Sequence, residues 1–211
     1  MRSCLYVISI VIVPVWMCCP ARGEIVFDSI TEATQFGGGV VTAPGFHGGD
    51  VVQLAGSSRI ATRVDVLLYE FGAGVPGDLT FKVYFWDRVG VPGNLIWQSP
   101  AQHASLLNRT PTVVSVEVPG VRVPDLLAWT VQGISNLHSA GVVGAFPATI
   151  GTPIGQIVGP PWSYGGFPPN SGCLGFRLIA VPEPTTGVLI ALGVVVLFCA
   201  RTCATLHQRH R

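Results

Sequence analysis

Between residues 24 and 180 the chain repeatedly alternates apolar and polar side chains, and this period of two constrains the fold more than any other feature. In residues 79–86 the odd positions are Leu, Phe or Val, whereas the even positions are Thr, Lys, Tyr and Trp. Similar alternation occurs in 114–118, 127–131 and 174–178. Successive side chains of a β-strand point to opposite faces, so strands produce this pattern and helices do not. We therefore predict an all-β fold for 24–180, arranged as an antiparallel β-sandwich.

Turns rich in proline and glycine separate these strands. The sequence Gly-Val-Pro-Gly occurs at 74–77 and again at 90–93. Proline fixes φ at the second position of a type II turn and glycine accepts the positive φ of the third. The two turns flank the strand predicted at 79–86, which favours a meander over a repeat architecture.

Charge and composition exclude several classes of protein. The 211-residue chain has a net charge of +1, and 49% of its residues are hydrophobic, which argues against disorder. Residues 24–180 carry seven basic and ten acidic residues, a net charge of −3. The chain has no basic stripe, so we expect no nucleic-acid partner.

The first 23 residues have the three parts of a secretory signal peptide. A basic start precedes an apolar centre, and small residues follow before Glu24. We expect cleavage between Gly23 and Glu24, with cleavage after Ala21 as the alternative. A retained N-terminal membrane helix is the other interpretation, and Pro14 argues against a long unbroken helix.

Residues 181–211 also divide into three parts. The segment begins with Val181, Pro182, Glu183 and Pro184. An uncharged run follows to residue 200, and the basic end contains Arg201, Arg209 and Arg211. The apolar run predicts a transmembrane helix over about 185–204. By the positive-inside rule the basic end stays in the cytoplasm, and the signal peptide directs 24–180 outward.

This three-part tail resembles the PEP-CTERM sorting signal of Gram-negative bacteria. The resemblance implies recognition by exosortase, a membrane-embedded cysteine protease, and delivery to the cell surface or the exopolysaccharide matrix. A plain C-terminal membrane anchor with a proline-rich stalk is the alternative. The layout of 24–180 also resembles exported domains that precede this tail. That second resemblance implies a jelly-roll-like sandwich of about eight or nine strands.

Cysteine placement argues against a disulfide framework. Of six cysteines, only Cys173 lies within 24–180, so this region has no intrachain disulfide, and we expect Cys173 to be a buried small apolar residue. Cys199, Cys203 and His207 are spaced to share one helical face. A metal site there is disfavoured because half of it would lie in lipid.

The sequence contains no recognised catalytic motif. It lacks Gly-x-Ser-x-Gly, His-Glu-x-x-His and a phosphate-binding loop. His47, His103 and His138 are isolated in the sequence, and we expect them on the surface or in loops. We expect no enzyme activity, no cofactor and no metal. A hydrolase that uses paired carboxylates remains the second alternative.

An aromatic segment at 160–169 is the remaining candidate for binding. Its Trp162 and Tyr164 lie among glycines and prolines and could stack against a sugar ring. The competing interpretation, which we favour, is that both rings plug the end of the sandwich core. The leading hypothesis is therefore a non-catalytic surface or matrix structural protein that associates with exopolysaccharide. The first alternative is a carbohydrate-binding module that uses Trp162 and Tyr164.

Overall fold

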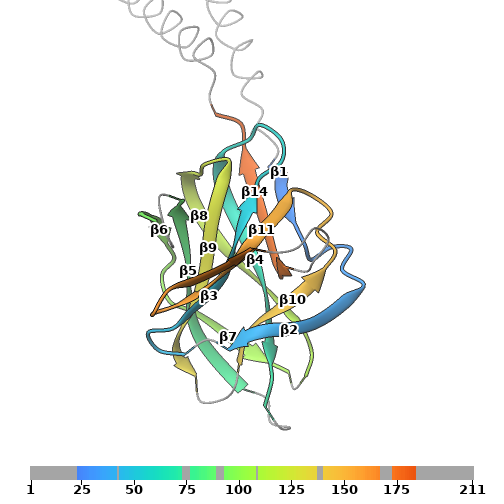
Figure 1. Ribbon diagram of the computed structural model, residues 1–211, viewed down its shortest axis with the longest axis vertical. Helices are drawn as coiled ribbons and strands as arrows, with labels where there is room; N and C mark the ends of the chain where they lie inside the picture. The colour runs from blue at the N-terminus through green and yellow to red at the C-terminus, as the bar shows by residue number, and fades with distance from the viewer. Residues whose placement is uncertain are drawn as a thin grey trace, which may run out of the picture. The chain divides into compact units, whose positions relative to one another are not determined.

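The computed structural model describes residues 23–41, 43–72, 77–88, 93–107, 109–136, 140–166 and 173–183 (Figure 1). Gly23–Pro182 forms one compact unit. The predicted signal peptide, the apolar run from residue 185 and the basic end fall outside the described residues, as does Pro184. Within the described residues, no helix has the length and apolar character needed to cross a membrane.

The described residues contain β-strands and no helix, as the alternation predicts. Fourteen strands occur among them, in chain order: β1 (Glu24–Asp28), β2 (Gln35–Val41), β3 (His47–Gln53), β4 (Ile60–Glu70), β5 (Gly77–Asp87), β6 (Leu95–Gln98), β7 (Gln102–Leu106), β8 (Thr112–Arg122), β9 (Leu126–Asn136), β10 (Ala140–Phe146), β11 (Thr152–Gly159), β12 (Ser163–Gly166), β13 (Cys173–Leu174) and β14 (Phe176–Val181).

The first sheet is built around the long strand β4. Strand β14 pairs along one edge of β4 and β8 along the other, and β1 adds outside β14. Strand β10 pairs with the last residues of β4 and carries β2 and β13. Every pairing is antiparallel. Gly175 lies between β13 and β14, where a Cβ atom would come within 2.4 Å of the Cβ of Leu67.

The second sheet follows the order β12-β11-β3-β9-β5, and all its pairings are antiparallel (Figure 1). The outer edge of β5 pairs with β7 over its first half and with β6 over its second half. Strand β5 covers the residues whose alternation was clearest in the sequence, and its odd-numbered residues from Leu79 to Phe85 are fully buried.

The two sheets share one hydrophobic core. It takes buried residues from β4, β8 and β14 of the first sheet and from β5 and β9 of the second. Trp129 of β9 stacks on Phe176 of β14, with ring centroids 4.2 Å apart. Cys173 is buried and free, as predicted. The core packing therefore joins the sheets face to face.

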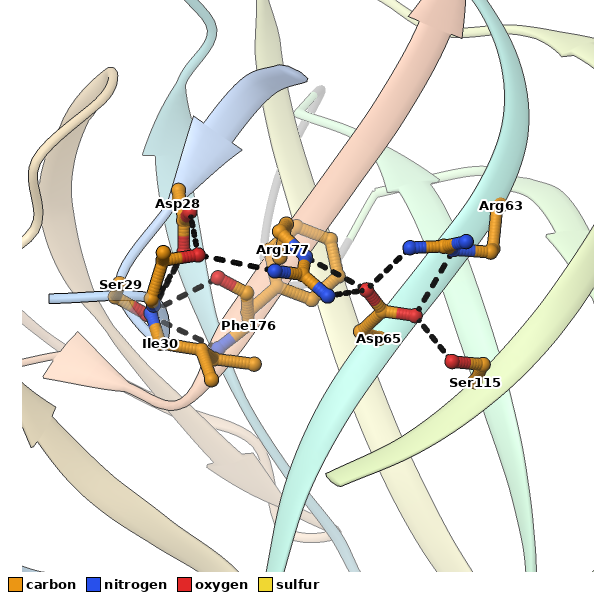
Figure 2. Close-up of polar contacts among 9 residues, drawn as sticks. Asp28, Ser29, Ile30, Arg63, Asp65, Ser115, Phe176 and Arg177 are labelled. Carbon is orange, nitrogen blue, oxygen red and sulfur yellow. Dashed lines mark hydrogen bonds and ion pairs between the residues drawn. The ribbon is translucent and has the colours of Figure 1, made fainter. Parts of the chain in front are cut away.

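An ion-pair network binds three strands of the first sheet on its outer side (Figure 2). Asp65 of β4 lies opposite Arg177 of β14 and Ser115 of β8 in the sheet register. Its Oδ2 is 2.6 Å from Nε of Arg177, and its Oδ1 accepts a 2.6 Å hydrogen bond from Ser115 Oγ. Nε of Arg63 lies 3.2 Å from Oδ1. Figure 2 also shows Arg177 reaching toward the turn after Asp28.

These contacts determine the ionisation of Asp65. Burial alone raises the pKa of this carboxyl, but the hydrogen bonds from Ser115 and Arg177 and the charges of Arg177 and Arg63 outweigh burial and lower the pKa. A carboxyl with a lowered folded-state pKa stabilises the fold above its unfolded pKa, and the benefit disappears as the pH falls.

We expect Asp65→Asn to lower the free energy of unfolding at pH 7 by about 1–3 kcal/mol. The effect stays moderate because the side chains of Arg63 and Arg177 are 39% and 22% exposed and solvent screens their charges. Urea unfolding measures it. Ser115→Ala removes a single hydrogen bond and is expected to cost about 1 kcal/mol. Equal losses from the two variants would contradict the ion-pair assignment.

Candidate functional site

A cluster of aromatic side chains lies on the outer side of the second sheet. Because the odd-numbered residues of β5 enter the core, the even-numbered Tyr84 and Trp86 point the other way. Strand β3 contributes His47, and the segment around β12 contributes Trp162 and Tyr164. We call these five residues the aromatic face.

Four rings of the aromatic face contact one another, and Tyr164 packs beside Trp86 and Trp162 on the same small cluster of buried residues. His47 lies at the centre, with ring centroids 4.8 Å from Tyr84 and 5.1 Å from Trp162. Trp86 is 5.8 Å from Tyr84 in a stacked arrangement and 6.0 Å from Trp162 in an edge-on one. His47 and Tyr84 are each 8% exposed, whereas Trp86, Trp162 and Tyr164 are half-buried. The last three residues therefore keep part of their surface in solvent, and His47 and Tyr84 pack against Trp86.

Two glycines of β11 let the outer rings lie against the sheet. A Cβ atom on Gly155 would come within 2.6 Å of the Tyr164 ring. A Cβ atom on Gly159 would come within 2.7 Å of Trp162. Glycine has no side chain, so a glycine in a strand often marks a place where another group approaches the backbone closely. Gly155 and Gly159 thus have a packing role, whereas a Cβ atom on Gly165, next to Tyr164 in the sequence, would meet nothing within 4 Å.

Hydrogen bonds fix the orientation of three members of the aromatic face, His47, Tyr84 and Trp86. Nε1 of Trp86 donates to Oγ1 of Thr130 at 3.0 Å, and Nδ1 of His47 is 3.1 Å from the same hydroxyl. The Tyr84 hydroxyl donates to Oε1 of Gln132 at 2.6 Å. Burial lowers the pKa of His47 to about 4 and raises that of Tyr84, so both are neutral at pH 7. The ring cluster itself therefore carries no charge.

Two cations border the aromatic face. The guanidinium carbon of the exposed Arg88 lies 4.6 Å from the centroid of the Tyr164 ring, a cation–π contact. Lys82 lies on the same side of β5 as Tyr84 and is half-buried. In the described part of the chain, neither cation has a carboxylate within ion-pair distance.

The structure corrects two predictions about individual residues. Trp162 and Tyr164 do not plug the core between the sheets, because they pack on the separate small cluster of Val51, Ala128 and Ile157. Both residues are half-buried on the outer side of the second sheet.

Among the histidines, His47 is neither in a loop nor on the surface, since it is buried in β3. His103 is exposed, as predicted, with Nδ1 2.9 Å from Thr80 Oγ1. His138 lies outside the described residues.

Sequence reasoning missed His47, Tyr84, Trp86 and Arg88 as members of this site. A signal for two of them was present, because Tyr84 and Trp86 occupy the even positions of 79–86. The contribution of β3 depends on strand order, which a single sequence does not reveal.

Other sequence-predicted sites are placed as follows. Gly23 is exposed and Glu24 begins β1, where Oε2 of Glu24 accepts a 2.5 Å hydrogen bond from Ser58. Val181 ends β14, and Pro182 and Glu183 follow it outside any strand. Among the described residues, no group of three or more His, Cys, Asp or Glu side chains could hold a metal ion.

No protein-family model, no curated protein and no solved structure matches this chain.

Proposed function

We propose that the protein is an exported, non-catalytic component of the cell surface or extracellular matrix that binds polysaccharide on its aromatic face. The observation that carries the proposal is the position of Trp86, Trp162 and Tyr164 on the outer side of a sheet. Half-exposed aromatic rings on a rigid sheet offer flat apolar surfaces, and a sugar ring presents a matching apolar face of C–H groups.

The polar groups around the rings support the same role. Gln132, Lys82 and Arg88 can hydrogen-bond to sugar hydroxyls at the border of the platform. The inner contacts to Thr130 hold the rings in one arrangement before a ligand arrives, which lowers the entropy cost of binding. This proposal combines the structural-matrix hypothesis with its carbohydrate-binding alternative.

We expect Trp162→Ala to weaken binding to polysaccharide by about tenfold, because it removes one stacking surface. Affinity electrophoresis of the full chain in gels containing exopolysaccharide measures the effect, and quenching of tryptophan fluorescence gives a second readout. Phe36→Ala is the matched control, since Phe36 is an aromatic residue 49% exposed on the other sheet. Equal retardation of both variants, with unchanged melting temperatures, would contradict the proposal.

For localisation, we propose that 1–23 is a signal peptide and that 181–211 is a PEP-CTERM tail. Exosortase would be the processing partner, and the membrane would hold the chain through about 185–204 before processing. The motif of Val181, Pro182, Glu183 and Pro184 supports this proposal, together with Arg201, Arg209 and Arg211. Intact mass of protein recovered from cells and medium tests it. A mature chain that starts at Glu24 and still ends at Arg211 would indicate a permanent anchor.

We also propose a jelly-roll topology for the sandwich. The order β1-β14-β4-β8 facing β3-β9-β5-β7 supports it. A jelly roll has eight strands, and its first, last, third and sixth strands form one sheet. Counted along these eight strands, β1 is the first, β14 the last, β4 the third and β8 the sixth. In this scheme β10, β11 and β12 are an insertion before the last strand. That insertion supplies Trp162 and Tyr164, so the proposed binding surface is an addition to the basic fold.

A further inference from the structure

We propose that the polysaccharide bound by the aromatic face is anionic and carries carboxylates, as chains of uronic acids do. This inference rests on the function proposed above and specifies its ligand. The observation behind this inference is the uneven distribution of charge around the aromatic face.

The strands that form the aromatic face supply cations, whereas their carboxylates lie away from the aromatic rings. Strands β9, β11 and β12 contain no acidic residue. The acidic residues of β3 and β5 are Asp50, Asp78 and Asp87. Asp50 is fully buried on the core side, where Oδ2 accepts a hydrogen bond from Leu174.

The two acidic residues of β5 are also occupied away from the rings. Asp87 accepts hydrogen bonds from the backbone and side-chain amides of Asn94. Asp78 accepts a 2.7 Å hydrogen bond from Ser105. It lies on the same side of β5 as Lys82, about 13 Å from it along the strand and about 26 Å from Trp86. Among the described residues, neither Lys82 nor Arg88 therefore has a carboxylate within ion-pair distance.

The local charge is opposite to that of the region as a whole. Residues 24–180 have a net charge of −3, so an anionic chain is repelled over most of the surface. Lys82 and Arg88 make the border of the aromatic face locally positive. This contrast gives orientation and selectivity, because a neutral polysaccharide gains hydrogen bonds from Lys82 and Arg88 but no attraction between opposite charges.

The geometry of Arg88 suits a uronate. Its guanidinium is held 4.6 Å above the Tyr164 ring, beside the surfaces on which a pyranose would stack. The carboxylate of a uronic acid projects from the edge of the sugar ring, and a guanidinium binds such a group through two parallel hydrogen bonds. Lys82 of β5 lies six residues before Arg88, which directly follows the last residue of that strand, so the two are roughly 20 Å apart. A chain of several uronates can reach both cations, whereas a monosaccharide cannot.

The test compares polymers that differ only in charge. Binding of the full chain to polygalacturonate is measured beside binding to the same polymer after full methyl esterification, which removes the charge and keeps the backbone. We expect at least tenfold tighter binding to the acidic form, and we expect this preference to fade as salt is raised to about 0.5 M. Dextran sulfate is a third probe with a higher density of negative charge, and we expect it to bind more weakly than polygalacturonate if the uronate backbone, and not charge density alone, is recognised.

Variants connect the preference to named residues. We expect Arg88→Gln to lose about tenfold in affinity for polygalacturonate and less than about threefold for the esterified polymer, because glutamine can still hydrogen-bond to sugar hydroxyls. Arg88→Lys keeps the charge but loses the planar fork, so we expect an intermediate loss. Arg109→Gln, an exposed arginine outside the face, is the control.

Three results overturn the inference. They are equal affinity for acidic and esterified polymer, full binding by Arg88→Gln, and tighter binding to dextran sulfate than to polygalacturonate. In each case, loss of binding by Trp162→Ala would still uphold the proposed polysaccharide function. Absence of binding to every polymer in the set overturns both proposals.

Discussion

Replacing Phe176 with alanine is expected to lower the free energy of unfolding by about 3–5 kcal/mol. Phe176 is fully buried and contacts three other aromatic rings. Its ring stacks on Trp129 at 4.2 Å, meets Phe85 edge-on at 6.4 Å and lies 5.8 Å from Phe27. These partners come from β9, β5 and β1, so one side chain connects both sheets. The loss is a large share of the stability of a domain this size, which is typically about 5–15 kcal/mol.

The size of the effect follows from packing. Alanine removes the ring and leaves a cavity that β-strands cannot close, because their spacing is set by backbone hydrogen bonds to both neighbours. Urea unfolding followed by tryptophan fluorescence measures the change, since Trp129 reports directly on the site. Phe36→Ala, on an exposed side chain, is expected to change stability by less than about 1 kcal/mol. Similar values for the two variants would show that the inter-sheet stack does not stabilise the fold.

The alternation in the sequence was sufficient to predict the inner face of the second sheet. In 79–86 the odd residues enter the core and the even residues leave it, as expected from the period of two. The same logic predicted that Leu174, Phe176 and Leu178 share a face, and all three are in the core. Periodicity is local, so it predicts which residues of one strand point together without any knowledge of the neighbouring strands.

The aromatic face could not be predicted in the same way. It combines residues from β3, β5 and β12, which are separated by tens of residues and brought together only by strand order. Trp162 and Tyr164 were recognised as candidates, but sequence alone favoured the core for them because large aromatics are usually buried. The glycines at 155 and 159 decide the outcome, since they open a place for the rings on the outer side of β11.

The buried acid Asp50 was also missed, although the sequence contained a signal for it. Asp50 is in phase with Val52 and Leu54, which both belong to the core. Alternation therefore places its carboxyl on the inner side. Because Asp usually lies on the surface, the residue type argued against a buried position.

The second large effect is expected from Asp50→Asn, which should stabilise the protein at pH 8 by about 4–5 kcal/mol. The carboxyl of Asp50 is completely buried between the sheets. Oδ2 accepts a 2.6 Å hydrogen bond from the backbone amide of Leu174, whereas Oδ1 has no hydrogen-bond partner among the described residues. Burial raises the pKa of Asp50 to about 8, and the amide hydrogen bond lowers it by less.

The direction of the pH dependence follows from this raised pKa. The folded protein keeps the proton on Asp50 up to about pH 8, whereas the unfolded chain releases it near its ordinary pKa of about 4. Unfolding therefore releases a proton between these values, and stability falls as the pH rises through this window. The benefit of the buried neutral acid is complete below about pH 4. Cys173 beside it does not interfere, because burial raises the pKa of its thiol to about 12.

The Asp50→Asn variant removes the charge of the side chain and keeps its shape. Its amide oxygen can still accept the hydrogen bond from Leu174, and it is neutral at every pH. We expect the variant and the native protein to have similar stability at about pH 4.5 and to diverge steadily toward pH 8. Urea unfolding at several pH values measures the divergence, with Glu32→Gln, an exposed acid, as the control. Parallel stability curves for Asp50→Asn and the native protein would mean that Asp50 is ionised in the folded state and that its charge is compensated inside the core.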